Sequence, residues 1–158
     1  MWRVRSPSWE FVGDPVMGGK SEGAFSLTAQ GKGQFEGMVR PDNGGGFASF
    51  KYDLPVPIDG QGWTGIAFEA LGDGRTYKIG LRHSTNRNRV VYQQPFLPDS
   101  GRWTKVRLPF SDFIPTWRGR TVTDAEALDP HQLESLSMFV SGGQFGPFRL
   151  LLDDWFLY

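Results

Sequence analysis

Hydrophobic and polar residues alternate along most of the chain, which is the pattern of strands that bury one face. In residues 75–83, for example, Tyr77, Ile79 and Leu81 fall on one side, and Lys78 and Arg82 fall on the other. Clusters of turn-forming residues separate the alternating segments. The pattern therefore predicts eight or nine strands, within residues 23–29, 33–39, 45–54, 64–71, 75–83, 89–96, 102–110, 133–142 and 146–158.

Strands of this number and length must each hide one face, so the pattern predicts an all-β sandwich of two packed antiparallel sheets. No linker or repeat interrupts residues 1–158, and we expect one domain. The Gly72-Asp73-Gly74 connection between two apolar segments predicts a hairpin. Helix is limited to a short turn that starts at Asp129 and Pro130, with a possible second turn at 123–127.

The composition supports this fold and narrows the function. The chain has 21 glycines, 11 prolines and 15% aromatic residues, which suits short strands joined by tight turns. Lysine plus arginine equals aspartate plus glutamate at 17 each, so no net charge favours nucleic acid or an anionic membrane. No apolar run is long enough for a membrane span or a secretory signal. We therefore expect a cytoplasmic protein that is not inserted in a membrane.

The stretch GDPVMGGKSEG at residues 13–23 is close to the phosphate-binding pattern G-x-x-x-x-G-K-[ST] but does not fit it. The first glycine of that pattern would fall at position 14, which is Asp14. An alternating segment follows Lys20 where the motif requires a helix. We interpret the stretch as a structured turn, with Gly18 and Gly19 for backbone shape and Asp14 and Ser21 for local hydrogen bonds.

Catalytic and metal-binding patterns are weak. His83 and His131 are the two side chains that could act as bases near neutral pH, and we expect solvated loop histidines. No G-x-S-x-G elbow presents a serine, and the absence of cysteine removes thiolate chemistry. Asp153 and Asp154 are adjacent in the last strand, so one should face a buried partner, which is an arginine or a calcium ion. The sequence predicts no catalytic residue, no metal site and no cofactor.

A binding face is the more informative prediction. Lys78 and Arg82, with Tyr92 and Gln94 from the next strand, can line a sheet face that holds a sugar or an acidic peptide. The alternative is an ordinary solvated face. Trp117 and Arg118 lie in the turn-rich segment FIPTWRGRTV and are typical of an interface anchor, although Trp117 could instead cap the core.

Six motifs in order along the chain carry a family resemblance: DPVMGGKSEGAF, GGGFASFK, GDGRTYKIGLR, YQQPF, LPFSDFIPTWRG and LLDDWFLY. Together they resemble the CIA30 family, named for complex I intermediate-associated protein 30. The resemblance implies a jelly-roll sandwich of the galactose-binding type. It also implies a non-enzymatic assembly chaperone, because the mitochondrial members assist the assembly of respiratory complex I. The family offers no catalytic residues to carry over.

The chain lacks the presequence of the mitochondrial members, so it is similar to a stand-alone, bacterial member. Our leading hypothesis is a non-enzymatic binding domain with a protein partner, acting in assembly. The alternative is a carbohydrate-binding module, which rests on analogy of fold alone.

Overall fold

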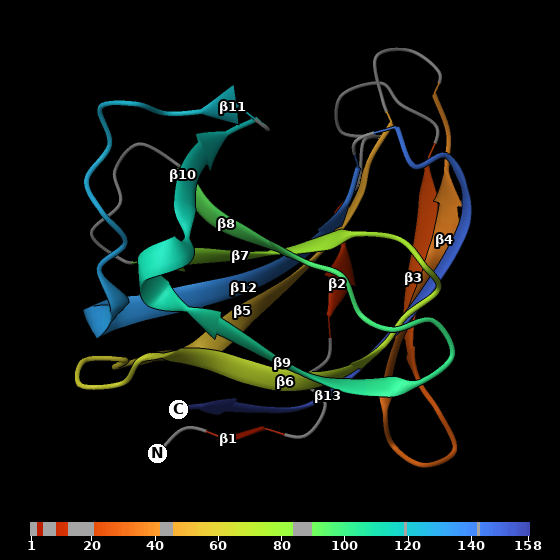
Figure 1. Cartoon of the computed structure of the whole chain (residues 1–158), viewed down its shortest axis with the longest axis horizontal. Coiled ribbons are helices and arrows are strands. Elements are labelled where there is room, and N and C mark those ends of the chain that lie inside the picture. Colours follow the sequence, from red (N-terminus) through yellow and green to blue (C-terminus); the bar gives the residue numbers. More distant parts are fainter. Residues whose placement is uncertain are drawn as a thin grey trace.

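Two antiparallel sheets packed face to face form the molecule (Figure 1). The computed structural model describes residues 3–4, 9–12, 21–41, 46–83, 90–118, 120–141 and 143–158. Within these residues every named strand pairs with an antiparallel neighbour, and the helices are single 3₁₀ turns. The predicted all-β sandwich of two antiparallel sheets is confirmed.

The six-stranded sheet has the order β3-β4-β13-β6-β9, and β1 also pairs with β13. Its strands are β1 (Arg3–Val4), β3 (Glu22–Leu27), β4 (Gly33–Val39), β6 (Gly65–Leu71), β9 (Trp103–Pro109) and β13 (Gly146–Leu157).

The seven-stranded sheet has the order β11-β10-β8-β7-β12-β5-β2. Its strands are β2 (Glu10–Phe11), β5 (Ala48–Ile58), β7 (Tyr77–His83), β8 (Val91–Phe96), β10 (Ile114–Trp117), β11 (Arg120–Thr121) and β12 (Leu133–Val140). Each of the nine predicted segments contains a strand, and the short strands β1, β2, β10 and β11 were not predicted.

Two 3₁₀ turns join strands, η3 (Phe110–Asp112) and η4 (Pro130–Gln132). The predicted start at Asp129 is confirmed, because its carboxylate accepts a hydrogen bond from the backbone N–H of His131 at 3.0 Å. Residues 123–127 form a turn and no helix. None of the helices in the described part of the chain is long and apolar enough to cross a membrane.

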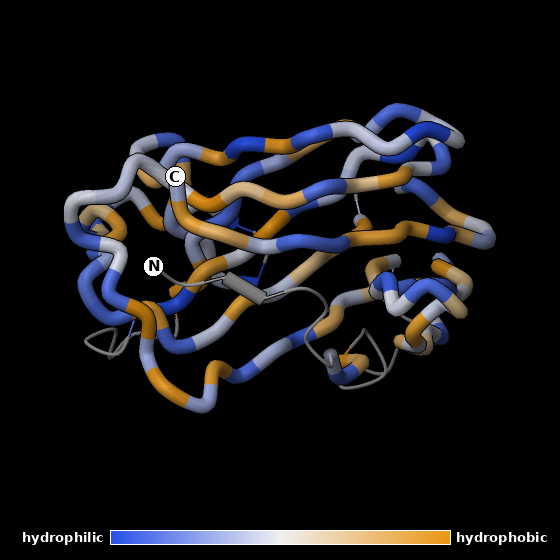
Figure 2. The backbone as a smooth tube through the Cα atoms, turned by 90° about the horizontal axis from the view of Figure 1, so that it is seen from below, coloured by the Kyte–Doolittle hydropathy of each residue, from blue (hydrophilic) through white to orange (hydrophobic). Residues whose placement is uncertain are grey.

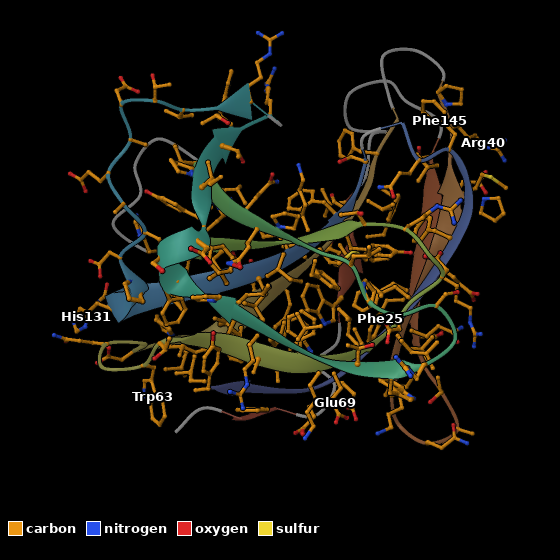
Figure 3. All side chains as sticks on the ribbon, in the orientation of Figure 1. Phe25, Arg40, Trp63, Glu69, His131 and Phe145 are labelled. Carbon is orange, nitrogen blue, oxygen red and sulfur yellow. The ribbon has the colours of Figure 1, made fainter. Side chains whose placement is uncertain are left out.

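Aromatic rings fill the space between the sheets. Trp155 is fully buried and stacks on Phe68 with ring centroids 4.4 Å apart, while Phe35 meets Phe50 edge to face at 5.0 Å. Along the strands hydrophobic positions alternate with hydrophilic ones, which places one set in this core (Figure 2). Phe145 and Arg40 lie at one end of the sandwich, and Trp63 and His131 at the other (Figure 3).

The hairpin predicted at Gly72-Asp73-Gly74 is wrong. β6 belongs to the six-stranded sheet and β7 to the seven-stranded sheet, so this connection crosses from one layer to the other. Gly72 forms a parallel bridge with Ser100, and a Cβ there would lie 2.6 Å from the Pro98 side chain. Gly72 thus serves a close-packed corner and not a two-stranded turn, while Gly74 has a positive φ of 93°.

A β-bulge interrupts β13 beside β6, between Asp153 and Phe156. Asp154 has a positive φ of 55°, a conformation that aspartate tolerates better than most residues. Up to the bulge Phe148, Leu150 and Leu152 face the core, and after it Trp155 and Leu157 do so. The extra residue therefore shifts the alternation by one position and turns the Asp154 side chain away from the core.

Candidate functional site

The outer face of the seven-stranded sheet, which points away from the six-stranded sheet, carries the polar residues of the central strands. One row across it runs Lys51, Ser137, Gly80 and Gln93, on β5, β12, β7 and β8. The flanking rows are Asp53, Ser135 and Arg82 on one side, and Ser49, Phe139, Lys78 and Pro95 on the other. Neighbouring positions in a row are about 5 Å apart, so these side chains form one continuous surface.

Lys78 and Arg82 lie on this outer face, as predicted, and point away from the core residues of β7. Within the described residues neither cation forms a hydrogen bond or an ion pair, in contrast to Lys51, whose Nζ is 3.2 Å from Asp53 Oδ1. The β7 side of the face therefore presents two cations that have no carboxylate partner in the described part of the chain.

Tyr92 and Gln94 do not share that face, and the predicted grouping is wrong in this respect. Tyr92 pairs with Leu81 and Gln94 pairs with Ile79, and both of those residues face the core. The Tyr92 hydroxyl donates to the Glu126 carbonyl at 2.8 Å, and Gln94 Nε2 donates to the Pro109 carbonyl at 3.0 Å. Both side chains tie strands to neighbouring segments from inside the sandwich.

Gln93 takes the place that was expected for its neighbours. It pairs with Gly80 and so belongs to the outer face. The alternation of β8 already separates Gln93 from Tyr92 and Gln94 in the sequence. The missing information was which of the two sets lies on the same side as Lys78, and only the cross-strand register supplies it.

Small residues form the centre of the outer face. Ser135 and Ser137 are 3% and 8% exposed, and Gly80 lies between Lys78 and Arg82. A Cβ on Gly80 would lie 2.7 Å from Val91 and 2.9 Å from the Phe139 ring, so these apolar groups close over the strand. Towards Phe139 the surface opens into a pocket of about 270 Å³, lined by Thr76, Lys78, Phe139, Ser141 and Gln144.

Trp117 and Arg118 lie at the edge of the same sheet, where β10 and β11 form a hairpin. Trp117 is 48% exposed, so it does not cap the core. The Arg118 guanidinium carbon lies 4.8 Å from the centre of the Trp117 ring, in a cation–π contact. Ile114 pairs with Gln93 and is 49% exposed, so it extends the central row of the outer face towards this hairpin.

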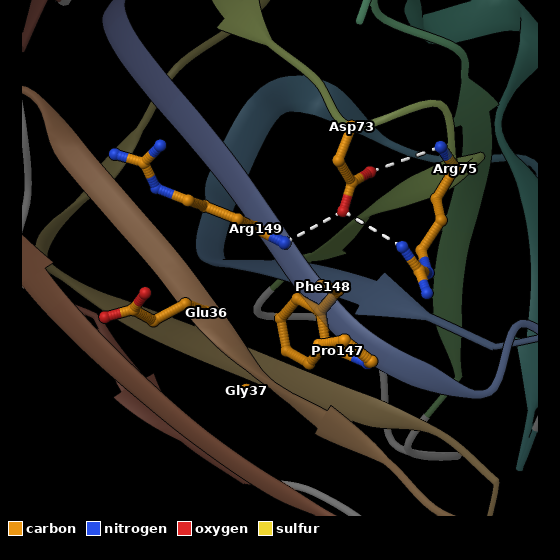
Figure 4. A pocket seen from close by; sticks show the side chains of 7 residues that line it. All are labelled: Glu36, Gly37, Asp73, Arg75, Pro147, Phe148 and Arg149. Atoms are coloured by element: carbon orange, nitrogen blue, oxygen red, sulfur yellow. Dashed lines mark hydrogen bonds and ion pairs between the residues drawn. The ribbon is translucent and has the colours of Figure 1, made fainter. Parts of the chain in front are cut away.

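A second pocket, of about 480 Å³, surrounds the corner at Asp73 (Figure 4). The Asp73 carboxylate accepts from the Tyr77 hydroxyl at 2.9 Å, from the Arg149 backbone N–H at 2.8 Å, and from the Arg75 backbone and Nη1. Burial and Asp73 raise the pKa of Tyr77 above its ordinary value. With its oxygens engaged in this way, Asp73 has a structural role as the corner between the sheets.

The signature loop falls mainly outside the described residues: Asp14, Gly18 and Gly19 are not among them. Ser21 is described and is buried, and its hydroxyl accepts from the backbone N–H of Arg40 at 3.0 Å. This bond joins Ser21 to the end of β4, and the expected local bond within the loop stays a prediction, because residues 13–20 lie outside the described residues. β3 starts directly after Ser21, so a strand and not a helix follows the glycine-rich stretch.

The histidines are placed differently from one another. His83 is buried and not solvated as expected, and its Nδ1 accepts from the backbone N–H of Asp129 at 3.0 Å. His131 is exposed, 3.2 Å from Asp59 Oδ1. The Gln61 backbone N–H, and to a lesser extent His131, lower the pKa of Asp59.

The buried carboxylate of the last strand has a lysine partner. Asp153 has a side chain 7% exposed, and Lys32 Nζ lies 2.6 Å from its Oδ2. The partner that the structure describes is therefore a lysine from the turn between β3 and β4, where the sequence suggested an arginine or a calcium ion. No group of three or more His, Asp or Glu side chains in the described ranges is arranged to hold a metal ion.

Comparison with known proteins identifies one family from the sequence and similar folds among solved structures. The family model described as Complex I intermediate-associated protein 30 (CIA30) matches residues 3–152. The mitochondrial protein of that name from Drosophila melanogaster is 25% identical over 92% of the chain. The chain spans 56% of the length of the fly protein.

Several of the similar solved structures are carbohydrate-binding modules, and their sequence identity to this chain is low. A family 11 module from Clostridium thermocellum, in complex with a β-1,3-1,4-mixed-linked tetrasaccharide, has a TM-score of 0.69 and 18% identity, with 94% of this chain and 87% of that chain covered. A family 30 module has a TM-score of 0.63 and 15% identity, with 100% of each chain covered. At this identity the likeness shows the fold alone.

Proposed function

The chain belongs to the CIA30 family, and from this premise we propose that it is a non-enzymatic binding domain that holds a protein partner in the manner of an assembly factor. The partner surface is the outer face of the seven-stranded sheet, with Lys78 and Arg82 as its cations. Trp117 and Arg118, at the hairpin on the edge of the same sheet, form a second contact beside it. The name of the fly relative supports an assembly intermediate of a respiratory complex as the partner. The cytoplasmic location stays a prediction from the sequence.

The observation that carries this proposal is the difference between the two cations and their surroundings. Lys32, Arg75 and Arg102 are all paired with aspartates, whereas Lys78 and Arg82 lie on one face with no acidic partner among the described residues. Exposed Ile114 extends that face, whereas exposed Trp117 lies on the other side of β10, at its hairpin end. Aromatic and arginine side chains are typical anchors of protein interfaces.

Capture of partners from the source organism tests the proposal. The tagged chain is compared with Lys78→Glu and with Lys105→Glu, which makes the same change on β9 of the other sheet. We expect subunits of a respiratory assembly to be captured by the original chain and by Lys105→Glu, and lost with Lys78→Glu. Equal capture by all three chains would refute this face as the partner surface.

Carbohydrate binding is the second candidate, and the fold shared with the family 11 module favours it. Calorimetry with the mixed-linked tetrasaccharide separates the two functions. Saturable binding of this sugar that is lost in Arg82→Ala would support the carbohydrate-binding module. Catalysis is not proposed, because Nδ1 of His83 is occupied by the Asp129 N–H and His131 is an exposed residue of η4.

A further inference from the structure

Arg82 and Ser135 lie directly opposite each other on β7 and β12, in the row that also contains Asp53. Two of their polar atoms, Nε of Arg82 and Oγ of Ser135, are buried and have no hydrogen-bond partner within the described part of the chain. Ser135 is 3% exposed, so its hydroxyl is deep in the outer face. Buried polar groups are nearly always hydrogen-bonded in native proteins, and two unsatisfied neighbours indicate a position for a ligand group.

A comparison with Arg75 shows what is unusual at Arg82. Nε of Arg75 is also buried and has no partner in the ranges that the structure describes, but its Nη1 bonds to Asp73 at 3.3 Å and its Nη2 to the Phe145 carbonyl at 3.2 Å. The guanidinium of Arg75 is thus held by the fold. That of Arg82 makes no hydrogen bond or ion pair with the described residues. Nε is covered in this structure, but Arg82 as a whole is only partly buried, so a change of side-chain rotamer would present its guanidinium to a partner.

The donors at this position select the chemistry of the ligand. An arginine N–H can only donate, and the Nε and Nη groups on one edge of a guanidinium match the two oxygens of a carboxylate. The Ser135 hydroxyl is also covered in this structure, and it adds a third donor only where the rotamer change at Arg82 uncovers it. Asp53, the acid in this row, lies on the far side of Ser135 and is paired with Lys51, and Glu10 lies opposite Lys51.

We infer that Arg82 and Ser135 form a carboxylate subsite, which takes an aspartate or glutamate side chain of the protein partner. This inference rests on the proposed function, because it assumes that the outer face is the binding surface. Charge complementarity supports a protein ligand, because Lys78 adds a second cation on β7 that has no carboxylate partner among the described residues. The side chains of Phe139 and Val91 form an apolar surface around Gly80. An extended acidic segment with apolar side chains fits both features.

Titration of the full chain with an oligoglutamate peptide tests the subsite, with an oligoglutamine peptide of equal length as the control ligand. The Nε–H signals of the arginines are followed by NMR. We expect the Arg82 signal to move with oligoglutamate, while the Arg75 signal stays in place. Arg82→Lys keeps the charge but loses the paired N–H donors of the guanidinium, so it should weaken oligoglutamate binding about tenfold. Lys105→Gln should not change the binding.

Three results would overturn the subsite: unchanged affinity in a folded Arg82→Lys variant, equal binding of both peptides, or movement of the Arg82 signal by the mixed-linked tetrasaccharide and not by oligoglutamate. The dispersion of the backbone spectrum shows whether each variant is folded. Partner capture by the Lys78→Glu and Lys105→Glu chains is a separate measurement. If capture still depends on Lys78 while oligoglutamate fails to bind, the subsite is wrong and the proposed function stands.

Discussion

The hydroxyl of Tyr77 donates to the carboxylate of Asp73 at 2.9 Å, and this bond joins the two sheets at their corner. Tyr77 is fully buried at the start of β7, and Asp73 lies in the connection that leaves β6. The same carboxylate accepts the backbone N–H of Arg149 on β13, where β6 has ended. The Asp73 carboxylate thus takes the place of a β6 backbone carbonyl for Arg149, and it also binds Tyr77, the first residue of β7 in the other sheet.

Replacement of Tyr77 by phenylalanine should lower the free energy of unfolding by about 2 kcal/mol, because the variant loses a buried hydrogen bond to a charged group. Urea denaturation measures this difference. Tyr158→Phe is the matched control, since Tyr158 is only partly buried and its ring contacts Arg107, and its effect should stay within about 0.5 kcal/mol. Equal effects of the two substitutions would contradict the anchoring role.

Alkaline pH should weaken the fold through the same residue. Burial first, and then Asp73, raise the pKa of Tyr77 above the ordinary value of 10.0, while Arg75 acts in the opposite direction. Because the folded-state pKa is the higher one, the stabilisation is complete below about pH 10 and is lost as the pH rises towards the folded-state pKa. The free energy of unfolding should therefore fall above pH 10, and less steeply in Tyr77→Phe.

This pH dependence is measured by urea denaturation at constant ionic strength. Some slope should remain in Tyr77→Phe, because burial also raises the pKa of Tyr92 and of Tyr158. An identical slope in the original chain and the variant would mean that Tyr77 does not couple to folding.

Alternation in the sequence was sufficient to predict the strands and the sandwich, but not the pairing of strands. Asp73 illustrates the limit, because its neighbours in the sequence form a turn-like triplet that predicts a hairpin. The bonds that decide otherwise come from Tyr77 in one sheet and Arg149 in the other. The contact with Arg149 joins residues 76 positions apart in the sequence, so the local pattern carries no signal of it.

The binding face was predicted in part for the same reason. The alternation of β7 correctly separates Lys78 and Arg82 from the core, and that of β8 separates Gln93 from Gln94. The pairing of Gly80 with Gln93 decides which alternate set of β8 side chains shares a face with Lys78. A slip of one residue would exchange the two faces. Arg82 and Ser135 become neighbours only through the pairing of β7 with β12.

The bulge at Asp154 should tolerate residues that adopt positive φ and reject β-branched ones. We expect the free energy of unfolding of Asp154→Val to be about 1–2 kcal/mol lower than that of Asp154→Gly, because valine is strained in this conformation. Asp154→Asn is the control and should remain within about 0.5 kcal/mol of the original chain. If the Asp154→Val variant were as stable as Asp154→Gly, the positive φ at the bulge would not be what shifts the alternation and brings Trp155 into the core.

The Lys32–Asp153 ion pair should show energetic coupling in a double-mutant cycle of Lys32→Met and Asp153→Asn. The Asp153 side chain is 7% exposed, but that of Lys32 is 35% exposed, so solvent screens part of the interaction. We expect a coupling energy of about 1–2 kcal/mol, measured by urea denaturation of the four chains. Additive effects of the two substitutions would show that the pair contributes nothing to stability.

The same substitution at two adjacent residues tests the assignment of the faces. Gln94→Glu places a carboxylate inside the sandwich and removes the donor to the Pro109 carbonyl, so it should cost about 3 kcal/mol of unfolding free energy. Gln93→Glu should change stability by less than about 0.5 kcal/mol, because its side chain lies on the outer face. Gln93→Glu should nevertheless weaken oligoglutamate binding, because its negative charge, in the row next to that of Arg82, repels the negative peptide.

Urea denaturation gives the two stabilities, and NMR titration at fixed ionic strength gives the affinities. If Gln93→Glu unfolded as readily as Gln94→Glu, the register between β7 and β8 would be wrong, and Lys78 and Arg82 would not share a face with Gln93. If Gln93→Glu kept its stability and bound oligoglutamate unchanged, the register would hold, but the acidic segment would have to bind elsewhere. The pair of variants therefore separates an error in the fold from an error in the ligand.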